Sequence, residues 1–171
     1  MPVTFDRIAT TTLASTSTSI TFSSITNTYT DLRLVLSCGG MGQPGSIRIR
    51  TNGITSANYS YANLTIGGGS SSAGFGFAVS QSTMEFGSGT TDSEGAHLLV
   101  VDFLDYYRAD SISKNIFGEL TAQGGTGTST SRTVSTMGRA STPGVAISSI
   151  EVYNPTFPIG TVATLYGIAR A

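Results

Sequence analysis

Few residues in this 171-residue chain could do acid–base or nucleophilic chemistry. His97 is the only histidine and Cys38 the only cysteine, so a serine triad or a cysteine–histidine pair would have to use His97. Both residues border apolar, strand-like runs, where structural histidines and buried thiols are common. A single cysteine cannot form an internal disulfide. We expect Cys38 to be an inert, buried thiol and His97 to be structural.

Acidic residues gather around one apolar segment. Asp92 and Glu94 precede it, Asp102 lies within it, and Asp105 and Asp110 follow. Two carboxylates could act as a glycosidase pair, and oxygen ligands on a loop suit Ca²⁺. Neither use has a diagnostic spacing here. We therefore expect capping, turn and surface roles, with no enzymatic activity, no metal and no cofactor.

Gly40, Gly42 and Gly45 spell the G-x-G-x-x-G pattern of dinucleotide-binding proteins. That fingerprint requires a helix to begin at its last glycine, so that the helix N-terminus meets the pyrophosphate. Here Pro44 precedes the last glycine and the strand-like segment SIRIRT follows it. The pattern therefore predicts a loop between two strands.

Aromatic residues flank a Gly/Ser loop at residues 67–74 and also stand near residue 107. Aromatic rings beside flexible glycines could form a sugar platform or a protein–protein contact, although filling the core is an equally good use of them. Six residues are candidates for such a contact: Tyr59, Tyr61, Phe75, Phe77, Tyr106 and Tyr107.

The elements that would position these residues are β-strands. In AHLLVVDFLDYY, residues 96–107, both alternating sets of side chains are largely apolar, which is typical of a central strand covered on two faces. The β-rich residues 111–121 follow after a polar turn, which predicts a long antiparallel hairpin. Turns are expected at 26–28 and 52–53, and Asn154-Pro155 and Phe157-Pro158 are expected to bracket a further turn. Other strands are expected at 3–13, 18–23, 31–38, 46–51, 59–66, 75–80, 83–86, 132–137, 145–153 and 160–169.

The composition supports this all-β reading. Charged residues make up 11% of the chain, far below the usual ~25%, and serine, threonine and 21 glycines take their place. We predict a single domain, residues 1–171, folded as an antiparallel β-sandwich or jelly roll of about eight to ten strands with little or no helix. Residues 1–16 are a candidate N-terminal arm.

Charge limits the classes of partner. The net charge is −1, Lys114 is the only lysine and no basic patch exists, so we expect no nucleic-acid binding. No apolar run approaches the ~20 residues of a membrane span, and the N-terminus lacks the pattern of a signal peptide.

Monomers usually guard sheet edges with lysine, proline or charge. This chain has little of these, so we expect neighbouring subunits to cover some edges.

Five segments together resemble small virion proteins of tailed bacteriophages, particularly phages of aquatic bacteria: TFDRIATTTLASTSTSITFSSI, TYTDLRLVLSCGG, SIRIRTNG, NYSYANL and TVATLYGIARA. The likeness is best at the two ends and poor over residues 67–95. It implies a β-sandwich or jelly-roll subunit of the virion and carries over no functional residues.

The leading expectation from this resemblance is a capsid decoration, or cement, protein. It would stabilise the head lattice through contacts with the major capsid protein or other virion proteins. A homotrimer is expected, because decoration proteins often sit on local three-fold axes. The alternative is a tail-fibre or baseplate adhesin that binds a host surface glycan.

Overall fold

The computed structural model describes residues 4–40, 46–67, 73–86, 95–109, 113–122, 132–141 and 145–169. These residues form β-strands, turns and irregular segments and contain no helix. None of them forms a helix long and apolar enough to cross a membrane. The twelve strands are β1 (Thr4–Thr12), β2 (Ser17–Phe22), β3 (Asp31–Cys38), β4 (Ile47–Thr51), β5 (Tyr59–Gly67), β6 (Gly74–Gln81), β7 (Met84–Phe86), β8 (His97–Leu104), β9 (Lys114–Ala122), β10 (Arg132–Ala140), β11 (Ile150–Phe157) and β12 (Val162–Ala169).

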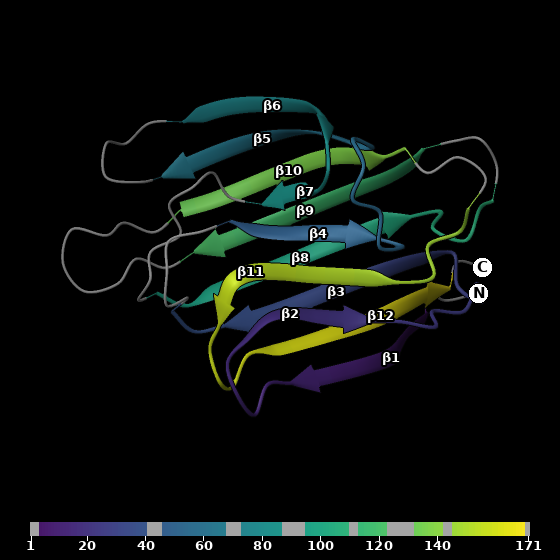
Figure 1. Ribbon diagram of the computed structural model, residues 1–171, viewed down its shortest axis with the longest axis horizontal. Helices are drawn as coiled ribbons and strands as arrows, with labels where there is room; N and C mark the ends of the chain where they lie inside the picture. Colours follow the sequence, from purple (N-terminus) through teal and green to yellow (C-terminus); the bar gives the residue numbers. More distant parts are fainter. Residues whose placement is uncertain are drawn as a thin grey trace.

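The larger sheet has eight strands in the order β1-β12-β3-β8-β9-β10-β5-β6, all antiparallel to their neighbours (Figure 1). The predicted hairpin is its centre, with β8 paired to β9 from His97 opposite Ala122 to Leu104 opposite Asn115. On its other side β8 pairs with β3, a strand about 65 residues earlier in the chain. The hairpin prediction is therefore confirmed.

The smaller sheet has four strands in the order β2-β11-β4-β7 and lies over one face of the larger sheet (Figure 1). The core fills the space between the two sheets, and strands of both contribute to it. In β3, Leu32, Leu34 and Leu36 are completely buried, while Ile47 and Ile49 face them from β4. The predicted antiparallel β-sandwich is confirmed, whereas a jelly-roll connectivity stays a prediction.

Glycines bring the small sheet close to the large one. A Cβ atom on Gly118 of β9 would lie 2.2 Å from the Phe86 ring of β7. A Cβ on Gly138 of β10 would lie 2.8 Å from the Met84 side chain of the same strand. Real Cβ atoms do not approach other atoms so closely, so β7 packs where β9 and β10 carry no side chain.

Several predicted boundaries were wrong. The strand predicted to run through residue 107 ends at Leu104, because Asp105 has a left-handed φ of 50° and begins a turn. The last strand of the small sheet begins at Ile150 and not at residue 145. Asn154 and Pro155 lie within β11, at a shift in its pairing with β2, and not in the predicted turn. The count of eight to ten strands was too low.

Other local predictions agree with the structure. Asn52 and Gly53 both have positive φ, 54° and 64°, and the Ile54 N–H donates to the Thr51 carbonyl, as a tight turn requires. The Asn52 side chain accepts from the Ser148 N–H at 2.8 Å and donates to the Ala146 carbonyl, which ties this turn to the segment before β11. Residues 4–12 of the candidate arm form strand β1, hydrogen-bonded to β12.

Candidate interaction surface

Large apolar side chains gather on one surface, the face of the eight-stranded sheet that points away from the small sheet. Among the described residues, twelve large hydrophobic side chains are exposed, and strand alternation places nine of them on this face. We call these nine residues the apolar face: Phe5, Leu64, Ile66, Phe75, Phe77, Val79, Leu98, Phe117 and Met137.

Strand β8 shows why the face is apolar. Leu99 and Val101 point to the core and are 0% exposed, while Leu98, between the core-facing His97 and Leu99, is 47% exposed. The sequence predicted that this strand is covered on two faces. The structure covers only one, since the described chain places no second layer over the outer side. The second set of apolar residues therefore lies at the surface.

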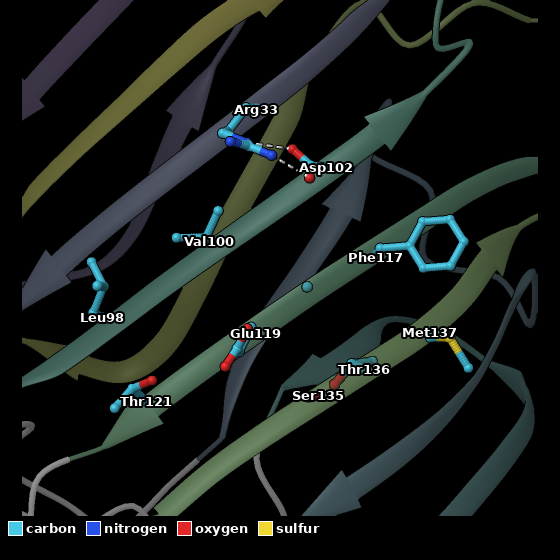
Figure 2. A pocket seen from close by; sticks show the side chains of 11 residues that line it. Arg33, Leu98, Val100, Asp102, Phe117, Glu119, Thr121, Ser135, Thr136 and Met137 are labelled. Carbon is cyan, nitrogen blue, oxygen red and sulfur yellow. Dashed lines mark hydrogen bonds and ion pairs between the residues drawn. The ribbon is translucent and has the colours of Figure 1, made fainter.

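A groove of ≈ 550 Å³ runs along this face over β8, β9 and β10 (Figure 2). Leu98, Val100 and Met137 give it apolar walls, and Phe117 adds an aromatic ring. Hydrogen-bonding groups also line it, among them Glu119, Thr121 and Ser135. Such a mixture suits contact with a protein side chain or with a sugar ring.

The charged groups at one end of the groove satisfy each other. Arg33 of β3 donates two hydrogen bonds to Asp102 of β8, from Nε to Oδ1 at 2.7 Å and from Nη2 to Oδ2 at 2.8 Å (Figure 2). This hydrogen bonding raises the pKa of Arg33 above its usual value, against the opposing effect of burial. The Arg33 guanidinium also lies 5.5 Å from the Phe5 ring centre. Asp102 is thus an ion-pair partner in this structure.

Of the other acidic candidates, Asp105 is the one that the structure describes. Asp105 is in the turn after β8, where its backbone N–H donates to Asp31 Oδ1 at 2.9 Å. Asp92, Glu94 and Asp110 lie outside the described residues. Within the described part of the chain, no three His, Cys, Asp or Glu side chains are grouped to hold a metal ion.

Cys38 and His97 are closer than their 59-residue separation suggests, because they are opposite each other on β3 and β8. Both side chains are buried, at 5% and 2% exposure. Burial raises the pKa of the Cys38 thiol to about 12. A nucleophilic cysteine needs a lowered pKa and access to substrate, so Cys38 is the inert, buried thiol that the sequence predicted.

The six aromatic candidates do not form one site. Phe75 and Phe77 are 74% and 78% exposed on the apolar face, and Tyr107 is 40% exposed in the turn after β8. Tyr59 and Tyr106 are completely buried, so they are not available at the surface. Their hydroxyl groups make structural contacts: Tyr59 accepts from the Thr51 N–H at 2.8 Å, and Tyr106 donates to the Thr26 carbonyl.

The sixth candidate, Tyr61, points inward and its hydroxyl donates to Glu85 of the small sheet at 3.4 Å. Burial, with a smaller effect of Glu85, raises the pKa of Tyr61 to about 12.

Reasoning from the sequence missed the members of the apolar face other than Phe75 and Phe77. The signal was present in the doubly apolar alternation of β8, which predicts cover on two faces but does not say whether the same chain or another protein provides it.

The described structure also bears on the glycine pattern. Gly40 follows β3, and β4 begins at Ile47, so the pattern joins two strands; residues 41–45 lie outside the described part. The loop predicted there is therefore not among the described residues and stays a prediction.

The likeness to phage virion proteins rests on strand-rich segments without a catalytic motif, and it stays a prediction. In comparisons with known proteins, no family model, no curated protein and no solved structure significantly matches this chain.

Proposed function

We propose that this protein is a structural subunit of a bacteriophage particle, a capsid decoration protein that binds the major capsid protein through the apolar face. The observation that carries the proposal is that nine of the twelve exposed large hydrophobic residues of the described chain lie on one side of the sandwich. Exposed apolar patches on a protein surface often mark sites of protein contact. The resemblance to virion proteins is the reason for proposing a phage particle as the place where this contact is made.

The chemistry of the face favours a near-neutral protein surface as its partner. Arg33 and Asp102 neutralise each other in a bidentate pair, and the whole chain has a net charge of −1. Electrostatic steering would therefore contribute little, and burial of apolar area would provide most of the affinity. A decoration protein that joins a lattice after assembly needs this kind of extended, rigid contact.

A binding experiment with purified heads tests the proposal. Leu98→Ser with Met137→Ser removes two members of the apolar face that are 47% and 60% exposed. Val145→Ser with Ile159→Ser is the matched control, since these residues are 50% and 66% exposed but lie outside the face. We expect at least an about tenfold loss of head binding for the first variant and wild-type binding for the control. Equal binding by both variants would contradict the proposal.

A second candidate function is a tail adhesin that binds a host glycan, and the groove favours it. Phe117 offers an aromatic ring for stacking, with Glu119 and Ser135 beside it as hydrogen-bonding groups. Copy number in purified virions separates the two candidates. On the order of hundreds of copies would indicate the head, and a few or tens would indicate the tail.

The groove also gives the adhesin its own test. Phe117→Ala should abolish glycan binding by an adhesin, whereas a decoration protein would show no specific glycan binding in wild-type form. Asp102→Asn tests a third possibility, because it removes one carboxylate of the groove and leaves the Arg33 guanidinium without this ion-pair partner. An activity on polysaccharide that this substitution abolishes would instead indicate an enzyme.

A further inference from the structure

The two free edges of the eight-stranded sheet, β1 and β6, are built differently (Figure 1). Strand β1 carries Asp6 and Arg7, and its pairing with β12 shifts between Arg7 and Ala9. Charged side chains and bulges are the usual means by which proteins keep an edge from pairing with another chain. Strand β6, with the sequence GFGFAVSQ, has neither charge nor proline.

The regular part of β6 is long enough to pair with another strand. Residues 74–78 pair with residues 61–65 of β5 without interruption. The irregularity of this strand comes later, where Ser80 has a left-handed φ of 54° and the pairing with β5 shifts. The unguarded stretch is therefore a flat edge of five residues, at the far side of the sheet from β1.

The two faces of β6 differ completely. Phe75, Phe77 and Val79 project onto the apolar face and are 74%, 78% and 62% exposed. Over residues 74–78 the opposite face has only Gly74, Gly76 and Ala78. A Cβ atom on Gly74 or Gly76 would meet nothing within 4 Å, and neither residue has a left-handed φ. No contact within the described chain requires these glycines, so this side of the strand carries only small residues that leave a second strand free to approach the edge.

We propose that the edge of β6 pairs antiparallel with β6 of a second copy around a two-fold axis, so that two eight-stranded sheets become continuous. Strand β6 is complementary to itself. Because side chains alternate with a period of two, antiparallel pairing that keeps the apolar faces aligned sets Phe or Val opposite Phe or Val, and Gly or Ala opposite Gly or Ala. A two-fold contact of this kind uses the same surface on both copies.

Charge also favours a second copy over a different partner. Strands β5 and β6 contain no acidic or basic residue, so a charged protein would find no complementary group along this edge. Two copies, each with a net charge of −1, would meet with little repulsion. Leu64 and Ile66 of β5 stand beside the phenylalanines, so the pairing would join two apolar strips into one.

The proposed contact is an edge and not a broad face. Five residues of each copy would pair, compared with the ~20–30 residues a side of a standard interface of ~1,600 Å², so we expect a concentration-dependent dimer and not an obligate one. Such a contact closes at two copies, unlike the trimer that the sequence predicted. The pairing uses the edge of β6 and does not depend on what binds the apolar face, so it can fail while the proposed function stands.

Sedimentation of the isolated full chain tests the pairing. Between about 5 and about 500 µM, wild-type protein should pass from the 17.6 kDa monomer toward twice that mass. Gly76→Lys adds a charge where the fold has open space, and should weaken dimerisation at least about tenfold. Thr10→Lys, a matched charge on the exposed surface of the other edge strand, should dimerise like wild type.

A second variant and a second measurement keep the test decisive if Gly76→Lys does not fold. If Gly76→Lys does not fold, Phe77→Lys places the same charge on a side chain that is 78% exposed. Hydrogen exchange should also show the backbone amides of β6 gaining protection as wild-type concentration rises, with no gain in β1. Wild-type protein that stays monomeric, forms a trimer, or dimerises equally well with a lysine in β6 would overturn the proposal.

Discussion

The outer face of the four-stranded sheet and the outer face of the eight-stranded sheet follow the same two-residue alternation but carry different side chains. The small sheet presents Arg48 paired with Glu85 at 3.9 Å and Arg50 paired with Glu151 at 3.7 Å. The Arg50 guanidinium also lies 4.3 Å from the Tyr153 ring centre. The large sheet presents the nine residues of the apolar face, with one bidentate ion pair among them.

This difference shows that the two-residue alternation determines the direction of the side chains but not what they meet. Alternation decides which side chains point away from the core, and it does so equally in both sheets. It does not decide what those side chains meet. Opposite charges on adjacent strands suit water, as on the small sheet, whereas exposed phenylalanine, leucine and methionine suit contact with another protein. We therefore interpret the small sheet as the solvent side of the protein and the large sheet as its contact side.

The largest expected effect separates the two sides of β8. Leu99 is 0% exposed, so Leu99→Ala should lower the free energy of unfolding by about 2–5 kcal/mol. Its neighbour Leu98 is 47% exposed on the apolar face, and Leu98→Ala should change stability by no more than about 0.5 kcal/mol. Urea unfolding of the two variants measures both values.

The same pair of variants can disprove the interpretation that the apolar face serves contact with a partner and not folding. If Leu98→Ala costs as much as Leu99→Ala, the apolar face contributes to the stability of the isolated chain, and its side chains need no partner to explain them. A small cost for Leu98→Ala together with weaker binding to heads would mean that the two sides of one strand serve folding and assembly separately.

Much of this fold could be predicted from the sequence, because local patterns carry it. The alternation in β3 and β4, the Asn52–Gly53 turn and the hairpin of β8 and β9 all follow from residues close together in the chain. The partition of the strands into eight and four does not, since β3 pairs with β8 and β12 across long stretches of sequence. Tertiary pairing also places Arg33 against Asp102, which are 69 residues apart.

The apolar face was harder to predict from the sequence than the core, for a physical reason. A strand that is apolar in both alternating sets has the same sequence whether a layer of its own chain or a separate protein covers it. Strand β8 was therefore predicted to be covered on two faces, and the described residues cover one of them. Phe75 and Phe77 were candidates for contact only because they flank a Gly/Ser loop, and the alternation of β6 then places them on the apolar face.

An intermediate effect concerns alkaline pH, which should lower the free energy of unfolding through groups in the core between the two sheets. Burial raises the folded-state pKa of Cys38 from 9.0 to about 12 and that of Tyr61 from 10.0 to about 12. In each case the unfolded chain releases its proton first, so rising pH favours unfolding. The stabilisation from Cys38 is complete below pH 9 and is lost as the pH approaches 12, at up to about 1.4 kcal/mol per unit.

Urea midpoints at about pH 8, 10 and 11 measure this loss. We expect the midpoint of wild-type protein to fall over this range. Cys38→Ala should flatten the decline from pH 9 and Tyr61→Phe should flatten it above pH 10, since each variant removes one of the protons concerned. A decline in Cys38→Ala as steep as that of the wild type would show that the thiol is not the group that resists ionisation.

The smallest expected effect compares the ion pairs of the two faces. Arg33 and Asp102 make two short hydrogen bonds, whereas Arg50 and Glu151 are 3.7 Å apart with no second contact between them. Both pairs are partly exposed, so solvent screens them and their coupling is small. Double-mutant cycles of alanine variants should give about 0.5–1 kcal/mol for the first pair and about 0.2–0.5 kcal/mol for the second.

Salt should sharpen this last difference. The side chains of Arg33 and Asp102 are 37% and 27% exposed and those of Arg50 and Glu151 are 26% and 31% exposed, so exposure does not distinguish the two pairs. Of the two pairs, only Arg33–Asp102 has two short hydrogen bonds, so added salt should reduce its coupling less than that of Arg50–Glu151. Equal coupling and equal salt dependence would mean that the bidentate geometry adds nothing measurable. A larger, salt-resistant coupling for Arg33–Asp102 would instead show that these two charges stay paired with each other, so that the apolar face needs no charged group from a partner.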